Sequence, residues 1–93
     1  MNRDSVITRN PQVVARELGG AEGAVLLHLE SGAYHGLNPV GHLIWELVDG
    51  ERTVADIIDA VRVQIADPPP QVDEDVVSFV ESAVQRNLLI ADS

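Results

Sequence analysis

Residues 34–50 read YHGLNPVGHLIWELVDG, and they predict the end of a β-strand that runs directly into an amphipathic helix. Asn38 can accept hydrogen bonds from the first free helical N–H groups, and Pro39 stands where its missing N–H costs nothing. The turn residues Asp49 and Gly50 end the helix. Apolar residues at helical spacing form its buried face, namely Val40, Leu43, Ile44, Leu47 and Val48. This stretch contains no metal cage, phosphate loop or nucleophile motif, so it predicts a structural junction.

Three short strands are predicted up to this junction. Val13–Glu17 forms the first, the apolar run Ala24–Leu29 the second and Ala33–Leu37 the third. Residues 30–32 form a short hairpin loop between the last two, in which Gly32 supplies the positive φ that such a turn needs. This spacing indicates an antiparallel meander.

The second half of the chain is predicted to be helical. Thr53, with Asp56 three residues later, resembles a capping box in which Asp replaces the usual Glu or Gln. Prolines 68–70 end that helix, because proline cannot continue the hydrogen-bond ladder. A last helix runs roughly from Gln71 to Arg86, and residues 88–90 can pack back on the core. The order predicts an α+β fold, winged helix-turn-helix-like, with a three-stranded antiparallel β-meander followed by three α-helices.

The last helix has an unusually wide apolar face. At about 100° per residue its apolar side chains cover an arc of about 160°, broader than the stripe that one core requires. The arc contains Val72, Val76, Val77, Phe79, Val80, Ala83 and Val84. Two interpretations stay open: the helix packs against two neighbours, or one edge of the arc lines a groove.

Composition and charge exclude several classes of protein. Ninety-three residues suffice for one small domain, and the absence of cysteine excludes disulfides, thiolate zinc sites and cysteine nucleophiles. No apolar run approaches the length of a membrane span, so we expect a cytoplasmic protein. Six arginines and no lysine face fifteen acidic residues, for a net charge of −9. This charge repels nucleic acid and anionic membranes and suits a basic or neutral peptide partner, although acidity also simply favours solubility.

The residues capable of chemistry form no catalytic constellation. His28, His35 and His42 fall on two strands and a helix without metal-ligand spacing, so they read as structural or surface histidines. The winged-helix order suggests DNA binding, but the last helix opens with acidic residues 73–75 and carries a single Arg86 near its end. Phosphate binding requires clustered cations, which disfavours DNA as the partner. We therefore expect no enzyme activity, no metal and no cofactor.

With these elements in place, the chain resembles a PqqD-like domain, the recognition element of systems that modify ribosomally made peptides. The resemblance covers about residues 12–91 and leaves residues 1–11 as an N-terminal extension. It rests on the order and spacing of SGAYHGLN (31–38), WELVDG (45–50), RTVADI (52–57), DVVSFV (75–80) and NLL (87–89). Asn87 stands where many relatives have Gly, but Asn tolerates the left-handed conformation of a helix C-cap.

In its Tyr-x-Gly-Leu-Asn motif and its length, the chain is most similar to the stand-alone leader-binding proteins of lasso-peptide biosynthesis. This implies a non-catalytic protein that binds the leader of a precursor peptide and presents it to a cysteine protease-like leader peptidase. A separate ATP-dependent cyclase then acts on the released core. A rival interpretation is an acidic winged-helix adaptor or regulator that binds other proteins. A neighbouring gene that encodes a short precursor peptide would favour leader binding over the adaptor.

The resemblance also implies where the leader lies. In this family it adds as an antiparallel strand to the edge of the third strand, in the cleft against the third helix. The edge then consists of Ala33, Tyr34, His35, Gly36 and Leu37. The wall of the cleft comes from Val76, Phe79, Val80 and Ala83.

Overall fold

The computed structural model describes residues 2–18, 23–65, 67 and 69–92. Pro68, predicted as part of the stop after the second helix, lies outside them. The elements follow one another as β1 (Val6–Arg9), β2 (Val13–Glu17), β3 (Ala24–His28), β4 (Tyr34–Leu37), α1 (Pro39–Leu47), α2 (Val54–Gln64), α3 (Val72–Gln85) and β5 (Leu89–Asp92). The predicted α+β fold, an antiparallel meander followed by three helices, is confirmed. No helix in these ranges is long and apolar enough to cross a membrane.

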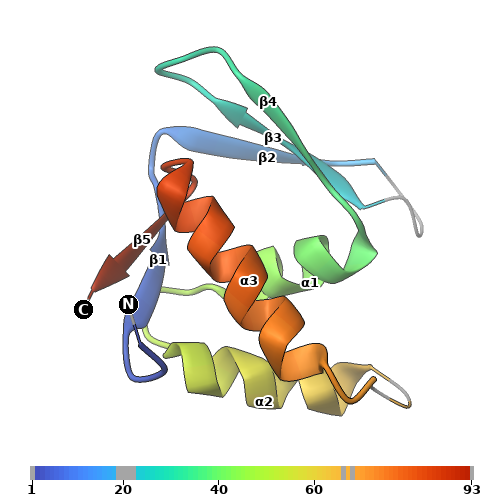
Figure 1. Ribbon diagram of the computed structural model, residues 1–93. Helices are drawn as coiled ribbons and strands as arrows, with labels where there is room; N and C mark the ends of the chain where they lie inside the picture. Colours follow the sequence, from blue (N-terminus) through green and yellow to red (C-terminus); the bar gives the residue numbers. More distant parts are fainter. Residues whose placement is uncertain (1, 19–22, 66, 68, 93) are drawn as a thin grey trace.

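The meander is a three-stranded antiparallel sheet in the order β2-β3-β4. It lies at the top of Figure 1, with the helices below it and α3 running diagonally across the front. Alternate side chains of β3 point toward the helices, so Ala24, Leu26 and His28 are buried. Val25 and Leu27 face outward. Because β4 passes directly into α1, the sheet edge is held beside the helical layer.

A second sheet, which the sequence does not predict, joins the two ends of the chain. β1 pairs with β5 in antiparallel register, from Val6 opposite Asp92 to Arg9 opposite Leu89. Ile7 within β1 has no exposed surface. Residues 6–9 therefore contribute to the core although the sequence places them in an extension; the boundary at residue 12 stays a prediction.

The predicted helix starts are present. The Asn38 side chain accepts a hydrogen bond from the Gly41 N–H at 2.7 Å, and Pro39 follows as the first helical residue. Thr53 and Asp56 form a reciprocal capping box with both hydrogen bonds at 3.1 Å. These caps fix where α1 and α2 begin, and the cap at Asn38 also fixes the direction in which the chain leaves β4.

The core lies between the inner face of the three-stranded sheet, the helices and the β1–β5 pair. Its largest fully buried apolar side chains are Trp45, Ile7, Leu26, Ile44, Ile57, Leu89, Val48, Val54, Val61, Val76 and Val80. Leu88 and Leu89 are buried, which confirms that the segment after α3 packs back on the core. α3 ends before Asn87, whose φ of 60° is the left-handed conformation expected there.

Candidate functional site

The outer edge of β4 is unpaired within the part of the chain that the structure describes. The N–H of His28 donates to the carbonyl of Ala33 at 2.9 Å, so the backbone of Ala33 faces β3. Hydrogen-bonded pairs recur at every second residue of an antiparallel ladder, and the backbone two and four residues later also faces β3. The N–H and C=O groups of Tyr34 and Gly36 therefore point away from the sheet. They form an open template for another strand.

A cleft of about 170 Å³ lies between this edge and α3. Leu37 and Ala83 are buried at its floor, whereas Phe79 and His35 are half-buried. A Cβ built on Gly36 would meet no atom within 4 Å, so the backbone is accessible there. The full lining consists of His35, Gly36, Leu37, Asn38, Phe79, Ser82, Ala83, Arg86 and Leu88.

A second hollow of about 400 Å³ continues the cleft toward α1. It shares Asn38 and Phe79 with the first hollow, so the two lie side by side. Its other lining residues are Val40, Gly41, Ile44, Asp75 and Ser78. We call the two hollows together the β4–α3 groove. Such a groove beside an open strand edge can hold an extended peptide, whose backbone pairs with β4 and whose side chains contact α3.

Comparison with known proteins identifies the family. The profile of PqqD, coenzyme PQQ synthesis protein D, matches residues 23–89. The chain belongs to the PqqD family. The resemblance to PqqD-like recognition elements is thereby confirmed.

Two solved structures are similar to this PqqD-family chain. TbiB1 in complex with the TbiA(beta) leader peptide has 30% sequence identity and a TM-score of 0.73; the match covers 88% of this chain and 93% of that one. Lasso peptide synthetase B1 complexed with the leader peptide has 20% identity and a TM-score of 0.73, over 91% and 98% of the two chains. At that identity the second likeness shows the fold alone. No curated protein matches the chain.

The structure brings together five of the nine predicted site residues. These five line the cleft: His35, Gly36, Leu37, Phe79 and Ala83. Tyr34 contributes its outward backbone, but its side chain is 72% exposed and lies on the outer face of the sheet with Val14 and Leu27. Ala33 precedes β4 and is half-buried.

Val76 and Val80 need a correction. Both have no exposed surface and belong to the core. They occupy the middle of the wide apolar arc of α3, and the middle of an arc points into the protein whereas its edges reach the surface. They pack into the core from α3, and neither of them lines the groove.

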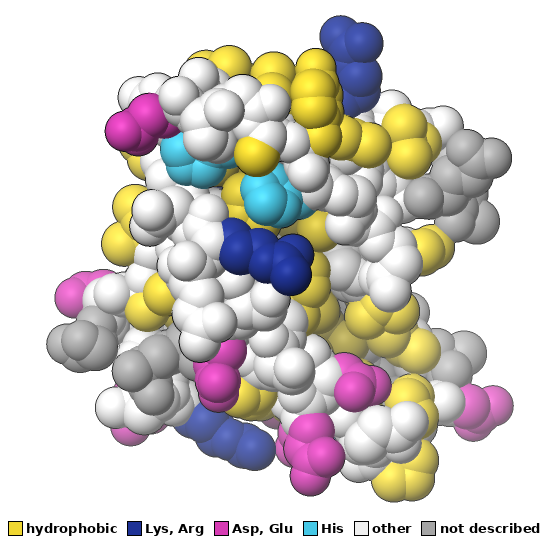
Figure 2. Space-filling view, turned by 45° about the horizontal axis from the view of Figure 1, so that its top comes forward, with side chains coloured by type: hydrophobic (Ala, Val, Ile, Leu, Met, Phe, Trp, Pro, Cys, Tyr) yellow, Lys and Arg dark blue, Asp and Glu magenta, His cyan; other side chains and the backbone are white. Residues whose placement is uncertain are grey.

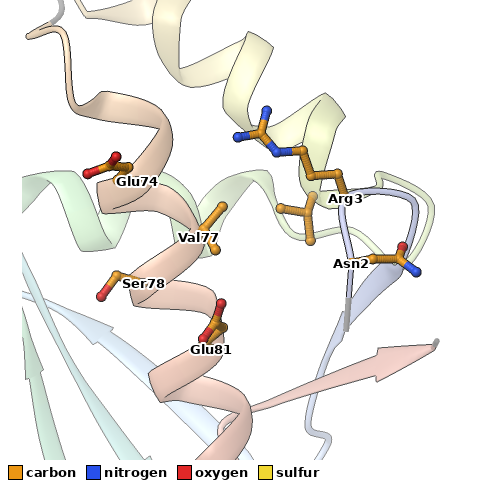
Figure 3. A pocket seen from close by; sticks show the side chains of 7 residues that line it. Asn2, Arg3, Glu74, Val77, Ser78 and Glu81 are labelled. Atoms are coloured by element: carbon orange, nitrogen blue, oxygen red, sulfur yellow. The ribbon is translucent and has the colours of Figure 1, made fainter.

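The two interpretations of the wide arc both hold, because α3 packs against α2 and β5 and one edge of its arc also lines a groove. Phe79 stands at the edge that lines the β4–α3 groove. Val77 stands at the other edge, in a separate hollow of about 380 Å³ between α3, the start of α2 and the N-terminal segment (Figure 3). Val77 points from α3 toward the segment that carries Arg3, and Glu74 and Glu81 line the same hollow (Figure 3). No described strand edge borders it, so it lacks the backbone template that the groove has.

Ser82, Arg86, Leu88 and Asn38 line the cleft but are not among the predicted residues. Ser82 and Arg86 follow Phe79 by three and seven positions, which is the spacing of one helix face. The sequence therefore carried a signal for them. The sequence prediction did not include them, because dividing the helix into an apolar and a polar face assigns polar side chains to the solvent side.

Three side chains outside the groove could hold a metal ion. The Oε1 atoms of Glu17 and Glu46 lie 3.5 and 3.1 Å from Nε2 of His42. Glu46 follows His42 by four positions on α1, so the two side chains share one face of the helix. The prediction from the sequence considered the spacing of the histidines alone and did not include Glu46. We assign no metal to this cluster, because Glu46 also pairs with Arg9 at 3.7 Å and both glutamates are exposed.

Proposed function

We propose that this PqqD-family protein binds the leader segment of a ribosomally made precursor peptide of the lasso type. The leader adds as a strand to β4 and lies in the β4–α3 groove. The observation that carries the proposal is the unpaired edge of β4, where the backbone groups of Tyr34 and Gly36 point outward beside the groove.

The chemistry of the groove suits a peptide better than a small substrate. Two outward-facing residues offer up to two N–H donors and two carbonyl acceptors, and each net hydrogen bond contributes about 0.5–1.5 kcal/mol. Main-chain pairing of this kind tolerates many sequences, and contacts with Phe79 and Leu37 add apolar selectivity. The similar chain TbiB1 was solved in complex with a leader peptide, which supports the proposal.

A titration with fluorescently labelled TbiA(beta) leader peptide tests this function. We expect saturable binding, protection of the Tyr34 and Gly36 amides from hydrogen exchange, and an unchanged peptide mass after incubation. Binding without protection of these two amides would refute strand addition. Absence of binding both to this peptide and to a leader encoded beside the gene would refute the function itself.

We also propose that the bound leader is presented to a leader peptidase, after which a separate cyclase acts on the core. Presentation requires a surface that the leader does not cover. The outer face of the three-stranded sheet offers one, since Val14 and Leu18 are 50% and 48% exposed there. Val14→Asp should leave leader binding unchanged and slow leader removal when the peptidase is added. Equal rates of removal would place the peptidase elsewhere.

The second candidate function is an acidic adaptor that binds other proteins without any leader. The same exposed apolar face and the net charge of −9 favour it. The leader titration distinguishes the two functions, because an adaptor of this kind would not bind the leader peptide at the edge of β4.

A further inference from the structure

Arg86 differs from the other arginines of this protein in its position and its lack of an ion pair. Of the six arginines, four form ion pairs: Arg3 and Arg62 with Asp73, Arg9 with Glu46, and Arg52 with Asp49. Among the described residues, Arg86 and Arg16 have no carboxylate within ion-pair distance. Arg16 lies on the outer face of the sheet, whereas Arg86 lines the β4–α3 groove beside His35. In a chain with net charge −9, a cation without a carboxylate partner at a binding groove requires an explanation.

The opposite end of the same groove is acidic. Asp75 lines the second hollow with Val40, and it also forms no ion pair within the described ranges. Asp75 and Arg86 are eleven positions apart on α3, a rotation of about 20° from one to the other at 100° per residue. They therefore lie on one line along the helix, with Phe79 and Ser82 between them. On the face shown in Figure 2, a basic side chain lies close to histidines near the middle, and most acidic side chains lie toward the bottom.

The distance between Asp75 and Arg86 along α3 predicts how far apart the matching charges lie along a bound peptide. Eleven residues of α-helix rise about 16 Å, which equals about five residues of an extended strand at 3.3 Å each. Both charges project from α3, so the peptide side chains that meet them must lie on the same face of the added strand. Side chains of a strand alternate between its faces, and this requires an even spacing of four or six residues.

The direction of β4 sets the order of the charges. β4 runs from His35, beside Arg86, toward Asn38, which lines the hollow of Asp75. An antiparallel peptide therefore enters at the Asp75 end and leaves at the Arg86 end. We propose that the groove selects leader peptides with a basic residue followed, four or six residues later, by an acidic residue. An apolar side chain between them faces Phe79. This inference rests on the proposed function.

A selection from a randomised peptide display library tests the inference. Wild-type protein should enrich peptides with the basic-to-acidic order at four or six residues. Arg86→Glu should lose the acidic preference, and the double change Asp75→Arg with Arg86→Glu should invert the order. Individual peptides with one charge reversed should bind wild type about three- to fivefold more weakly, the scale of a solvent-exposed ion pair.

The matched control is Glu74→Gln, one position from Asp75 but in the other hollow of α3, and it should select the wild-type pattern. Arg86, Asp75 and Glu74 are all exposed, and melting curves confirm that each variant is folded. An identical charge preference in wild type and in the swapped variant would overturn the inference. So would enrichment without any charge pattern. Failure of the proposed function gives a different result: no peptide is enriched, or Gly36→Pro enriches the same peptides as wild type.

Discussion

Gly41 of α1 lies directly against the ring of Phe79 on α3. A Cβ built on Gly41 would stand 3.0 Å from Cε2 of Phe79 and 3.3 Å from the capping oxygen of Asn38. Glycine at this helical position therefore brings α1 close to α3, and the position of the Phe79 ring, which borders both hollows of the groove, depends on it.

Gly41→Ala should weaken leader binding while the domain stays folded. The added methyl group should displace the Phe79 ring toward the groove. Alanine stabilises a helix interior by about 1 kcal/mol relative to glycine, and this gain should offset part of the strain. Binding of labelled leader and thermal melting measure the two effects. In a Phe79→Ala background the same change should have no effect on binding. An equal loss in both backgrounds would show that Gly41 acts through something other than Phe79.

Gly36→Pro should weaken strand addition with little change to the fold. Proline removes the outward N–H of Gly36 and is tolerated on edge strands, and its Cβ would meet no atom within 4 Å at this position. A peptide carbonyl left without its donor costs about 1–3 kcal/mol, or about five- to 150-fold in Kd. Gly36→Ala keeps the N–H and serves as the control. Equal affinities for the two variants would contradict pairing at this edge.

Val80→Asp should unfold the domain, and any loss of binding follows from that. The side chain has no exposed surface, and an unpaired charge in the core costs at least about 3 kcal/mol. The Phe79 side chain is only half-buried, so the Phe79→Ala variant should remain folded while it binds the leader more weakly. Circular dichroism and urea titration distinguish the two. A folded Val80→Asp variant would mean that this side chain faces the groove after all.

Arg9→Ala should lower the free energy of unfolding by about 1–3 kcal/mol. The Arg9 guanidinium donates two hydrogen bonds, of 3.1 and 2.8 Å, to the Trp45 carbonyl and lies 5.2 Å from the centre of the indole ring. Arg9→Lys should recover only part of the loss, because an ammonium group lacks the planar fork. The fluorescence of Trp45 follows urea unfolding directly. Arg16→Ala, exposed on the sheet, is the control; equal effects at both positions would contradict this role.

Asp49→Asn should destabilise the protein at neutral pH but not in acid. The Asp49 carboxylate accepts hydrogen bonds from the N–H groups of Glu51 and Arg52, both at 2.9 Å, and pairs with the Arg52 guanidinium at 3.2 Å. These contacts hold the pKa of Asp49 below its ordinary value. A lowered folded pKa contributes stability above the unfolded pKa, about 4, and this stability is lost as pH falls through the folded pKa. The gap between variant and wild type should therefore close below about pH 4. A gap that is constant with pH would contradict this assignment.

Several features could be predicted because they depend on neighbouring residues. Helix caps, hairpin turns and amphipathic faces involve residues within a few positions of one another, so their patterns are visible in the chain. The caps at Asn38 and Thr53 and the left-handed Asn87 were found in this way. The same local patterns placed His35, Gly36 and Leu37 on a strand and Phe79 on a helix, whereas the family resemblance implied that the strand edge and the helix lie side by side.

Tertiary structure alone decided the rest. The pairing of β1 with β5 joins segments about 80 residues apart, so that Ile7 has no local partner to reveal it. The sequence defined the apolar arc of α3 but not its orientation, and packing turned Val76 and Val80 inward and Phe79 outward. Periodicity determines which side chains share a face. Which face meets the core and which meets a partner depends on the elements packed against it.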